Sequence, residues 1–160
     1  MRAAFLIAFA ANVVLDIILL ISLPERAASH FGPGGAPDSW ASKETAVLMV
    51  FAVQALMLII FLAIPAIEPW VPRSLVNLPN KEYWLREENR PALRAKLAAF
   101  CYEFGIALFT LLLAVSLLML QANLSDPVRL NEAIFIPLLV VFLLYTIYRS
   151  VRFLRAFRLP

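Results

Sequence analysis

Four long apolar runs constrain this chain more than any other feature of its sequence. They cover residues 3–23, 45–67, 97–120 and 133–152, and each is long enough to cross a bilayer, which takes about 20 apolar residues in a helix. The last run is uncharged only to Tyr148, and Arg149 can extend it by snorkelling. With 62% hydrophobic residues among 160, the chain has too much apolar surface for a soluble domain. The sequence predicts an all-α integral membrane protein, an antiparallel bundle of four transmembrane helices that forms a single domain.

Basic residues separate the two ends of this bundle. Cytoplasmic loops of membrane proteins carry an excess of Lys and Arg. The positive-inside rule therefore predicts that both termini, the loop 68–96 and the basic tail 149–160 are cytoplasmic, and that the loop 24–44 faces outward. Eleven of the fourteen Lys and Arg lie on the predicted cytoplasmic side: Arg2, Arg73, Lys81, Arg86, Arg90, Arg94, Lys96, Arg149, Arg152, Arg155 and Arg158. Three lie on the other side: Arg26, Lys43 and Arg129.

The predicted outer loop collects unusual residues. It contains the only histidine and three of the four glycines. We expect this loop to be the ligand- or partner-binding segment, through His30, Phe31, Asp38, Trp40 and Lys43. A purely structural interpretation stays open, in which Ser42 caps the next helix, Trp40 anchors the loop at the interface and Asp38 pairs with Lys43.

Four amide or carboxyl side chains interrupt the first three apolar runs: Asn12, Asp16, Gln54 and Glu103. Ionisable groups inside a span are costly and are functional candidates by default. The first three are predicted to lie at similar depth, either as a hydrogen-bonded cluster between helices or as an outward-opening cavity in which Asp16 binds an ion or proton. Glu103 is expected nearer the cytoplasmic side, within reach of Arg94 or Lys96.

The cytoplasmic segments carry two further patterns. Prolines prevent a continuous helix over the first part of the loop 68–96, and a short helix is expected over 81–88 after Asn80. The last helix is expected to continue beyond Tyr148. Its four arginines would lie on one half of the helix surface, and Phe153, Leu154 and Phe157 would lie on the other half, facing lipid.

Enzymatic motifs are missing from the sequence. It has no HExxH, P-loop or GxSxG pattern, and Cys101 is the only cysteine. We therefore expect a non-enzymatic protein without a metal or another cofactor. Nucleic acid is not an expected partner, because the orientation rule already accounts for the basic tail.

The outer loop and the second loop together resemble a known family. The pattern Leu23-Pro24, His30-Phe31, Gly35-x-Pro37-Asp38-x-Trp40-x-Ser42-Lys43 is similar to a bacterial membrane domain of unknown function found at the N-terminal end of SdpI-like toxin immunity proteins. The resemblance covers about residues 3–121, with Phe31 where many relatives have Trp. It implies a multi-pass protein of the bacterial cytoplasmic (inner) membrane with this loop outside. It also marks a cytoplasmic motif: Asn77, Pro79, Asn80, Tyr83 and Trp84.

Three functions remain open at this level. The first is a non-enzymatic protein whose outer loop recognises an extracellular peptide or a protein partner in an SdpI-like signalling or immunity role. The second is an accessory or structural subunit of a larger membrane complex. The third is a transporter or channel component that uses the intramembrane polar residues. The expected partners are the lipid bilayer and a membrane protein or a second copy of the chain.

Overall fold

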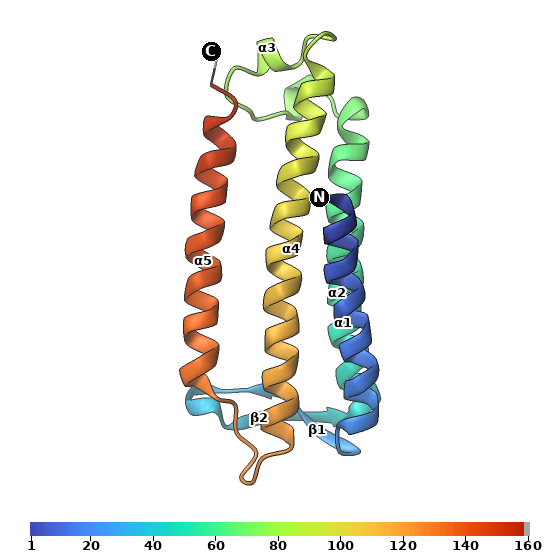
Figure 1. Cartoon of the computed structure of the whole chain (residues 1–160), viewed down its shortest axis with the longest axis vertical. Helices are drawn as coiled ribbons and strands as arrows, with labels where there is room; N and C mark the ends of the chain where they lie inside the picture. The colour runs from blue at the N-terminus through green and yellow to red at the C-terminus, as the bar shows by residue number, and fades with distance from the viewer. Residues whose placement is uncertain (159–160) are drawn as a thin grey trace.

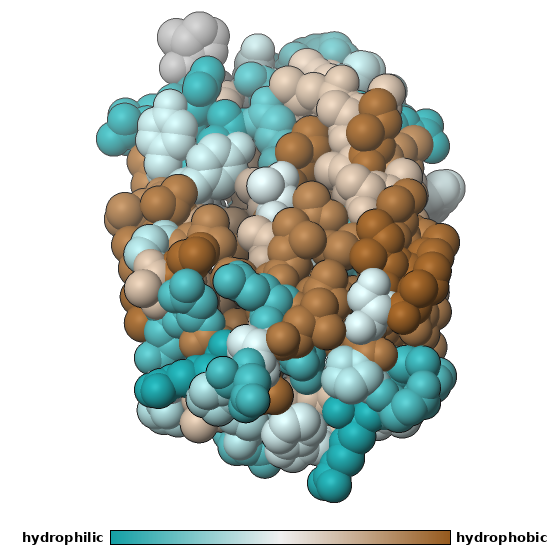
Figure 2. Space-filling view, turned by 60° about the horizontal axis from the view of Figure 1, so that its bottom comes forward, coloured by the Kyte–Doolittle hydropathy of each residue, from teal (hydrophilic) through white to brown (hydrophobic). Residues whose placement is uncertain are grey.

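Four long helices run side by side with alternating direction in the computed structural model, which describes residues 1–158 (Figure 1). They are α1 (Arg2–Ser22), α2 (Lys43–Ile67), α4 (Arg90–Asn123) and α5 (Glu132–Arg155). All four are long and apolar enough to cross a membrane, as the sequence predicts. Hydrophilic side chains gather toward both ends of the molecule, and hydrophobic ones form a band between them (Figure 2).

Local sequence signals explain two of the helix starts. Ser42 caps α2, because its side chain accepts a hydrogen bond from the Thr45 amide at 3.2 Å. Pro91 lies in the first turn of α4, where a missing amide hydrogen costs nothing, so α4 begins well before its apolar run. Asn131 precedes α5, but its side chain makes no capping hydrogen bond.

Residues 26–42 of the predicted outer loop form a β-hairpin, so the all-α prediction is wrong here. Strands β1 (Arg26–Phe31) and β2 (Pro37–Ser42) pair antiparallel, and a short 3₁₀ turn, η1 (Pro33–Gly35), joins them. Gly34 and Gly35 have φ values of 79° and 73°, which favour glycine, and they let the chain reverse within a few residues. The hairpin closes the lower end of the bundle in Figure 1, and we call this the hairpin end.

Three of the helices share a core, and the fourth stands beside them. Helices α1, α2 and α4 contact one another, and Phe5, Phe61 and Phe109 are buried between them. Gly105 on α4 allows this approach, because an added Cβ would collide with the Phe5 ring. Helix α5 packs mainly on α4, and none of its residues is buried. The bundle is therefore a three-helix core with one peripheral helix, rather than four equivalent helices.

The segment between α2 and α4, residues 68–89, folds over the other end of the bundle, and we call it the connector. It contains η2 (Glu68–Trp70), η3 (Arg73–Leu75) and α3 (Lys81–Trp84). Helix α3 stops four residues before the expected end at 88. Phe157 is fully buried against Trp84, Leu85 and Leu93. The expectation that Phe157 faces lipid is therefore wrong. Residues 159–160 of the expected basic tail lie outside the described residues.

Candidate functional sites at the hairpin and between the helices

One buried side chain fixes the hairpin to the helical core. Asn123, at the end of α4, accepts a hydrogen bond from the Ala28 amide at 2.6 Å and donates one to the Ala28 carbonyl at 3.1 Å. The Asn123 amide group also donates to the Met119 carbonyl at 2.9 Å, which fixes its orientation. Ala27 and Ala28 are fully buried against this helix end. Strand β1 is therefore the inner strand of the hairpin. Its edge that faces away from β2 is bonded to α4, and we call this the inner edge of the hairpin.

The tip of the hairpin is fixed a second time, by the loop between α4 and α5. Arg129 donates through Nε to the Gly34 carbonyl at 2.7 Å, and the Leu130 amide donates to the Gly35 carbonyl at 2.8 Å. A Cβ at Gly35 would collide with the Leu130 carbonyl. Segments about 95 residues apart in the chain thus hold the two-stranded sheet in place.

The exposed face of the hairpin carries most of the predicted binding residues. His30 Nδ1 lies 2.6 Å from Asp38 Oδ1, and both side chains are at least half exposed. Lys43 pairs with Glu25 at 2.7 Å. The expected Asp38–Lys43 pair is therefore wrong, because Asp38 contacts His30 and Lys43 contacts Glu25. Phe31 is half-buried and packs on the apolar cluster beneath the hairpin.

The outer edge of β2 is open at Trp40. Ala28 pairs with Trp40, and Ala28 directs both its peptide groups away from β2, toward Asn123. In an antiparallel ladder, such a residue belongs to a non-hydrogen-bonded pair, so its partner also directs its peptide groups outward. Trp40 therefore presents an amide and a carbonyl on the free edge. The Trp40 ring is 40% exposed, and the Arg26 guanidinium lies 5.9 Å from its centre.

Three of the intramembrane polar residues meet between the helices. Gln54 on α2 donates through Nε2 to Asp16 Oδ1 at 3.3 Å and to Asn12 Oδ1 at 3.5 Å. Asn12 donates in turn to the Ala8 carbonyl on its own helix and to the Phe109 carbonyl on α4. All three side chains are buried. The cluster ties α1, α2 and α4 together.

Glu103 forms an ion pair with Arg149 of α5. The expected partners Arg94 and Lys96 lie elsewhere: Arg94 contacts Glu68, and the Lys96 ammonium lies 5.3 Å from the centre of the Trp84 ring. The sequence could not show this, because the pairing depends on how far α5 continues beyond Tyr148. The ion pair joins the peripheral helix to the core within the apolar part of the bundle.

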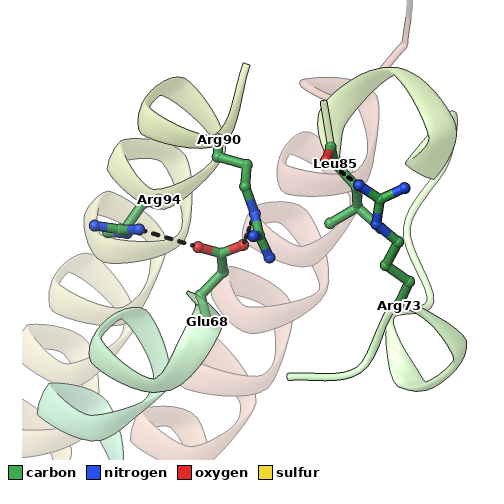
Figure 3. Close-up of polar contacts among 5 residues, drawn as sticks. All are labelled: Glu68, Arg73, Leu85, Arg90 and Arg94. Atoms are coloured by element: carbon green, nitrogen blue, oxygen red, sulfur yellow. Dashed lines mark hydrogen bonds and ion pairs between the residues drawn. The ribbon is translucent and has the colours of Figure 1, made fainter. Parts of the chain in front are cut away.

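Sequence reasoning missed a buried carboxylate at the connector. Glu68 is 6% exposed and lies between the guanidinium groups of Arg90 and Arg94, at 3.2 and 3.5 Å (Figure 3). Beside them, Arg73 donates to the Leu85 carbonyl at 3.4 Å. The available signal was an acidic residue at the end of the second apolar run, followed by two arginines four residues apart. This contact fastens the start of the connector to α4.

The predicted cytoplasmic motif holds the end of α5. Asn80 and Trp84 both donate to the Phe157 carbonyl, at 2.9 and 3.0 Å. Asn89 donates to the Tyr83 carbonyl and so braces α3 from the start of α4. Pro79 lies in the turn before α3, and Asn77 lines a pocket of about 240 Å³ beneath the connector. These contacts give the motif a structural role at the end of α5.

No group of three or more His, Cys, Asp or Glu side chains within residues 1–158 is arranged to hold a metal ion. The predicted binding residues lie in or directly beside the exposed hairpin, and three of the four predicted intramembrane polar residues form the buried cluster.

One comparison with known proteins bears on both sites. Residues 7–54 match the model of a family described as a domain of unknown function (DUF1648). The matched segment runs along α1, through the hairpin, and ends at Gln54 on α2. It contains every predicted hairpin residue and the whole Asn12–Asp16–Gln54 cluster. No curated protein and no solved structure matches the chain.

Proposed function

We propose that this chain is a non-enzymatic, multi-pass protein of the bacterial cytoplasmic membrane that recognises an extended peptide or a protein partner at its hairpin. The role would be SdpI-like, in signalling or immunity. One observation carries the proposal: the hairpin is fixed at its inner edge and at its tip, and its outer strand stays open. Support for the class of protein comes from the four apolar helices and the match over residues 7–54.

The orientation belongs to the same proposal. Charge asymmetry favours the connector and both termini in the cytoplasm, which leaves the hairpin outside. Cys101 is the only cysteine and is buried, so a Cys101→Ala background is free of thiols. We expect a membrane-impermeant maleimide to label Ser39→Cys in intact cells and to label Glu82→Cys only after the cells are opened. The opposite labelling would reverse the orientation and remove the hairpin from extracellular partners.

The open edge makes an extended backbone a suitable partner. An unpaired strand edge is a template on which a peptide adds as a further strand, with backbone hydrogen bonds for affinity and side chains for specificity. The Trp40 peptide groups supply the backbone contacts. The Trp40 ring and the His30–Asp38 pair lie exposed beside them and can select side chains. Rigid fixing by Asn123 and Arg129 lowers the entropy that binding would otherwise cost.

Photocrosslinking in the native host tests this recognition. A photoreactive phenylalanine at Trp40 should give a discrete adduct whose mass identifies the partner. The adduct from the neighbouring position Ser39 should weaken at least tenfold when His30 and Asp38 are both changed to Ala. The matched control places the same photoreactive residue at Ile59, which is exposed on α2 within the apolar band. Identical adducts from the two positions, or none at the hairpin, would contradict the proposal.

A second candidate function is an accessory subunit of a membrane complex, and the exposure of α5 favours it. Every residue of α5 is at least partly exposed, and its outer faces carry large apolar side chains such as Val141, Leu144 and Ile147. Lipid can cover these faces, and so can a partner helix. Size analysis of the chain extracted in gentle detergent tests whether a partner helix covers α5, because a lone monomer would exclude the accessory-subunit function.

A further inference from the structure

Two buried oxygen atoms in the polar cluster lack a hydrogen-bond donor. Among the described residues, Asp16 Oδ2 and Gln54 Oε1 have no hydrogen-bond partner, although Asp16 is 4% exposed and Gln54 is fully buried. The other half of each group is already paired, because Gln54 Nε2 donates to Asp16 Oδ1 at 3.3 Å. The carboxyl group and the carboxamide therefore face each other with one hydrogen bond made and two acceptors left over.

We propose that Asp16 is a proton-binding site whose proton is shared with Gln54. A proton on Asp16 Oδ2 becomes a donor to Gln54 Oε1, and the two groups then form a closed pair with two hydrogen bonds. This single proton satisfies both unpaired atoms. It also removes a negative charge that no cation balances, and an isolated buried carboxylate is far less stable than its neutral form.

The surroundings of Asp16 hold no basic group that could neutralise a carboxylate instead. On α1, the only other charged side chain is Arg2, almost four turns away. On α4, the stretch from Gly105 to Asn123 contains no titratable residue. On α2, the nearby titratable groups are Lys43 and Glu44 in the first turn, and Lys43 pairs with Glu25. Beyond them, the hairpin carries Arg26, His30 and Asp38, which contact one another or Trp40.

A route for the proton leads from the hairpin end. A groove of about 450 Å³ between α1 and α2 is lined by Asp16 and, nearer the hairpin, by Glu44. Its other walls are apolar and include Ile17, Val47 and Phe51. Glu44 is exposed at the start of α2, so it can exchange protons with water where the groove reaches the hairpin end. Asp16 therefore lines a groove that extends along α1 and α2 toward the hairpin end. The inference does not depend on the partner proposed for the hairpin.

Infrared spectroscopy of the full chain in lipid bilayers tests this assignment. The wild type at neutral pH should show the C=O band of a protonated carboxylic acid, shifted by D₂O. Asp16→Asn should abolish the band, and Glu132→Gln, which changes a carboxyl group at the start of α5, should keep it. The Asn side chain has the same size and can still pair with Gln54, so this variant should fold.

A second variant tests the pairing itself. Gln54→Leu removes the donor to Oδ1, and the band should move to higher frequency because the C=O is then free. A wild type without the band, as a carboxylate bridged by a water molecule would give, overturns the proposal. A band that survives Asp16→Asn, or that does not move in Gln54→Leu, overturns it as well.

Discussion

Helices α2 and α5 are of similar length and both are apolar, yet they are held in different ways. Helix α2 is held by packing: it shares an aromatic core and the Asn12–Asp16–Gln54 cluster with α1 and α4. Helix α5 has no buried residue and packs on one neighbour, α4, where the Phe100 and Phe153 rings stack. Its polar contacts are the Glu103–Arg149 ion pair and the hydrogen bonds to the Phe157 carbonyl beyond its last turn. In lipid, where apolar surface alone gives little reason for two helices to associate, such polar contacts decide where a peripheral helix lies.

The largest expected effect comes from removing the ion pair of α5. Arg149→Met leaves Glu103 unpaired in the apolar part of the bundle, and we expect the free energy of unfolding to fall by about 3 kcal/mol. Arg152→Met is the matched control, because that side chain reaches only the Tyr148 hydroxyl, at 3.4 Å. Equilibrium unfolding in mixed micelles measures both. Equal losses for the two variants would mean that α5 is held by packing after all.

Overpacking the three-helix core should cost somewhat less. A methyl group at Gly105 meets the Phe5 ring and comes within 3.1 Å of Phe61, so we expect Gly105→Ala to destabilise the fold by about 2 kcal/mol. Ala107→Val enlarges the same helix where it lines an open groove toward α5, and it should be nearly neutral. The same unfolding assay compares them. A neutral Gly105→Ala variant would show that the core of α1, α2 and α4 is loosely packed.

The hairpin should respond locally to loss of its anchor. Asn123→Ala leaves the Ala28 amide and carbonyl without partners, at an expected cost of about 1–2 kcal/mol. Hydrogen exchange at Ala27 and Ala28 should therefore quicken about tenfold, since 1.4 kcal/mol corresponds to that factor. Ser39→Ala, on the exposed strand, should change neither amide. Unchanged exchange in Asn123→Ala would show that the contact with the α4–α5 loop suffices to hold the hairpin.

The smallest effect should come from the connector. Asn80→Ala removes one of the two donors to the Phe157 carbonyl while Trp84 keeps the other, so we expect a loss of about 1 kcal/mol confined to the end of α5. Faster hydrogen exchange over residues 153–157 would report this local loss of stability. Asn77→Ala is the control, because Asn77 lines the pocket beneath the connector without contacting Phe157. A loss spread over the whole bundle would show that the connector supports more than α5.

Much of the helical architecture could be predicted from the sequence. The lengths of the apolar runs predicted the four helices, because only continuous helices satisfy their backbone groups in lipid. Ser42 marked the start of α2. The i, i+4 spacing of Asn12 and Asp16, with Gln54 at similar depth, predicted that these three side chains could meet. The hairpin was not predicted, because its strands are only six residues long and do not alternate between hydrophobic and polar residues.

The sequence by itself determined which segments are helical and apolar, because these properties depend on the local chain alone. The tertiary structure decided the partners. It placed Asp38 beside His30, Arg149 beside Glu103 and Phe157 beneath the connector, because each contact joins segments whose separation depends on strand register or helix packing. It also left Asp16 Oδ2 and Gln54 Oε1 facing the interior, because that depends on how α1 and α2 pack.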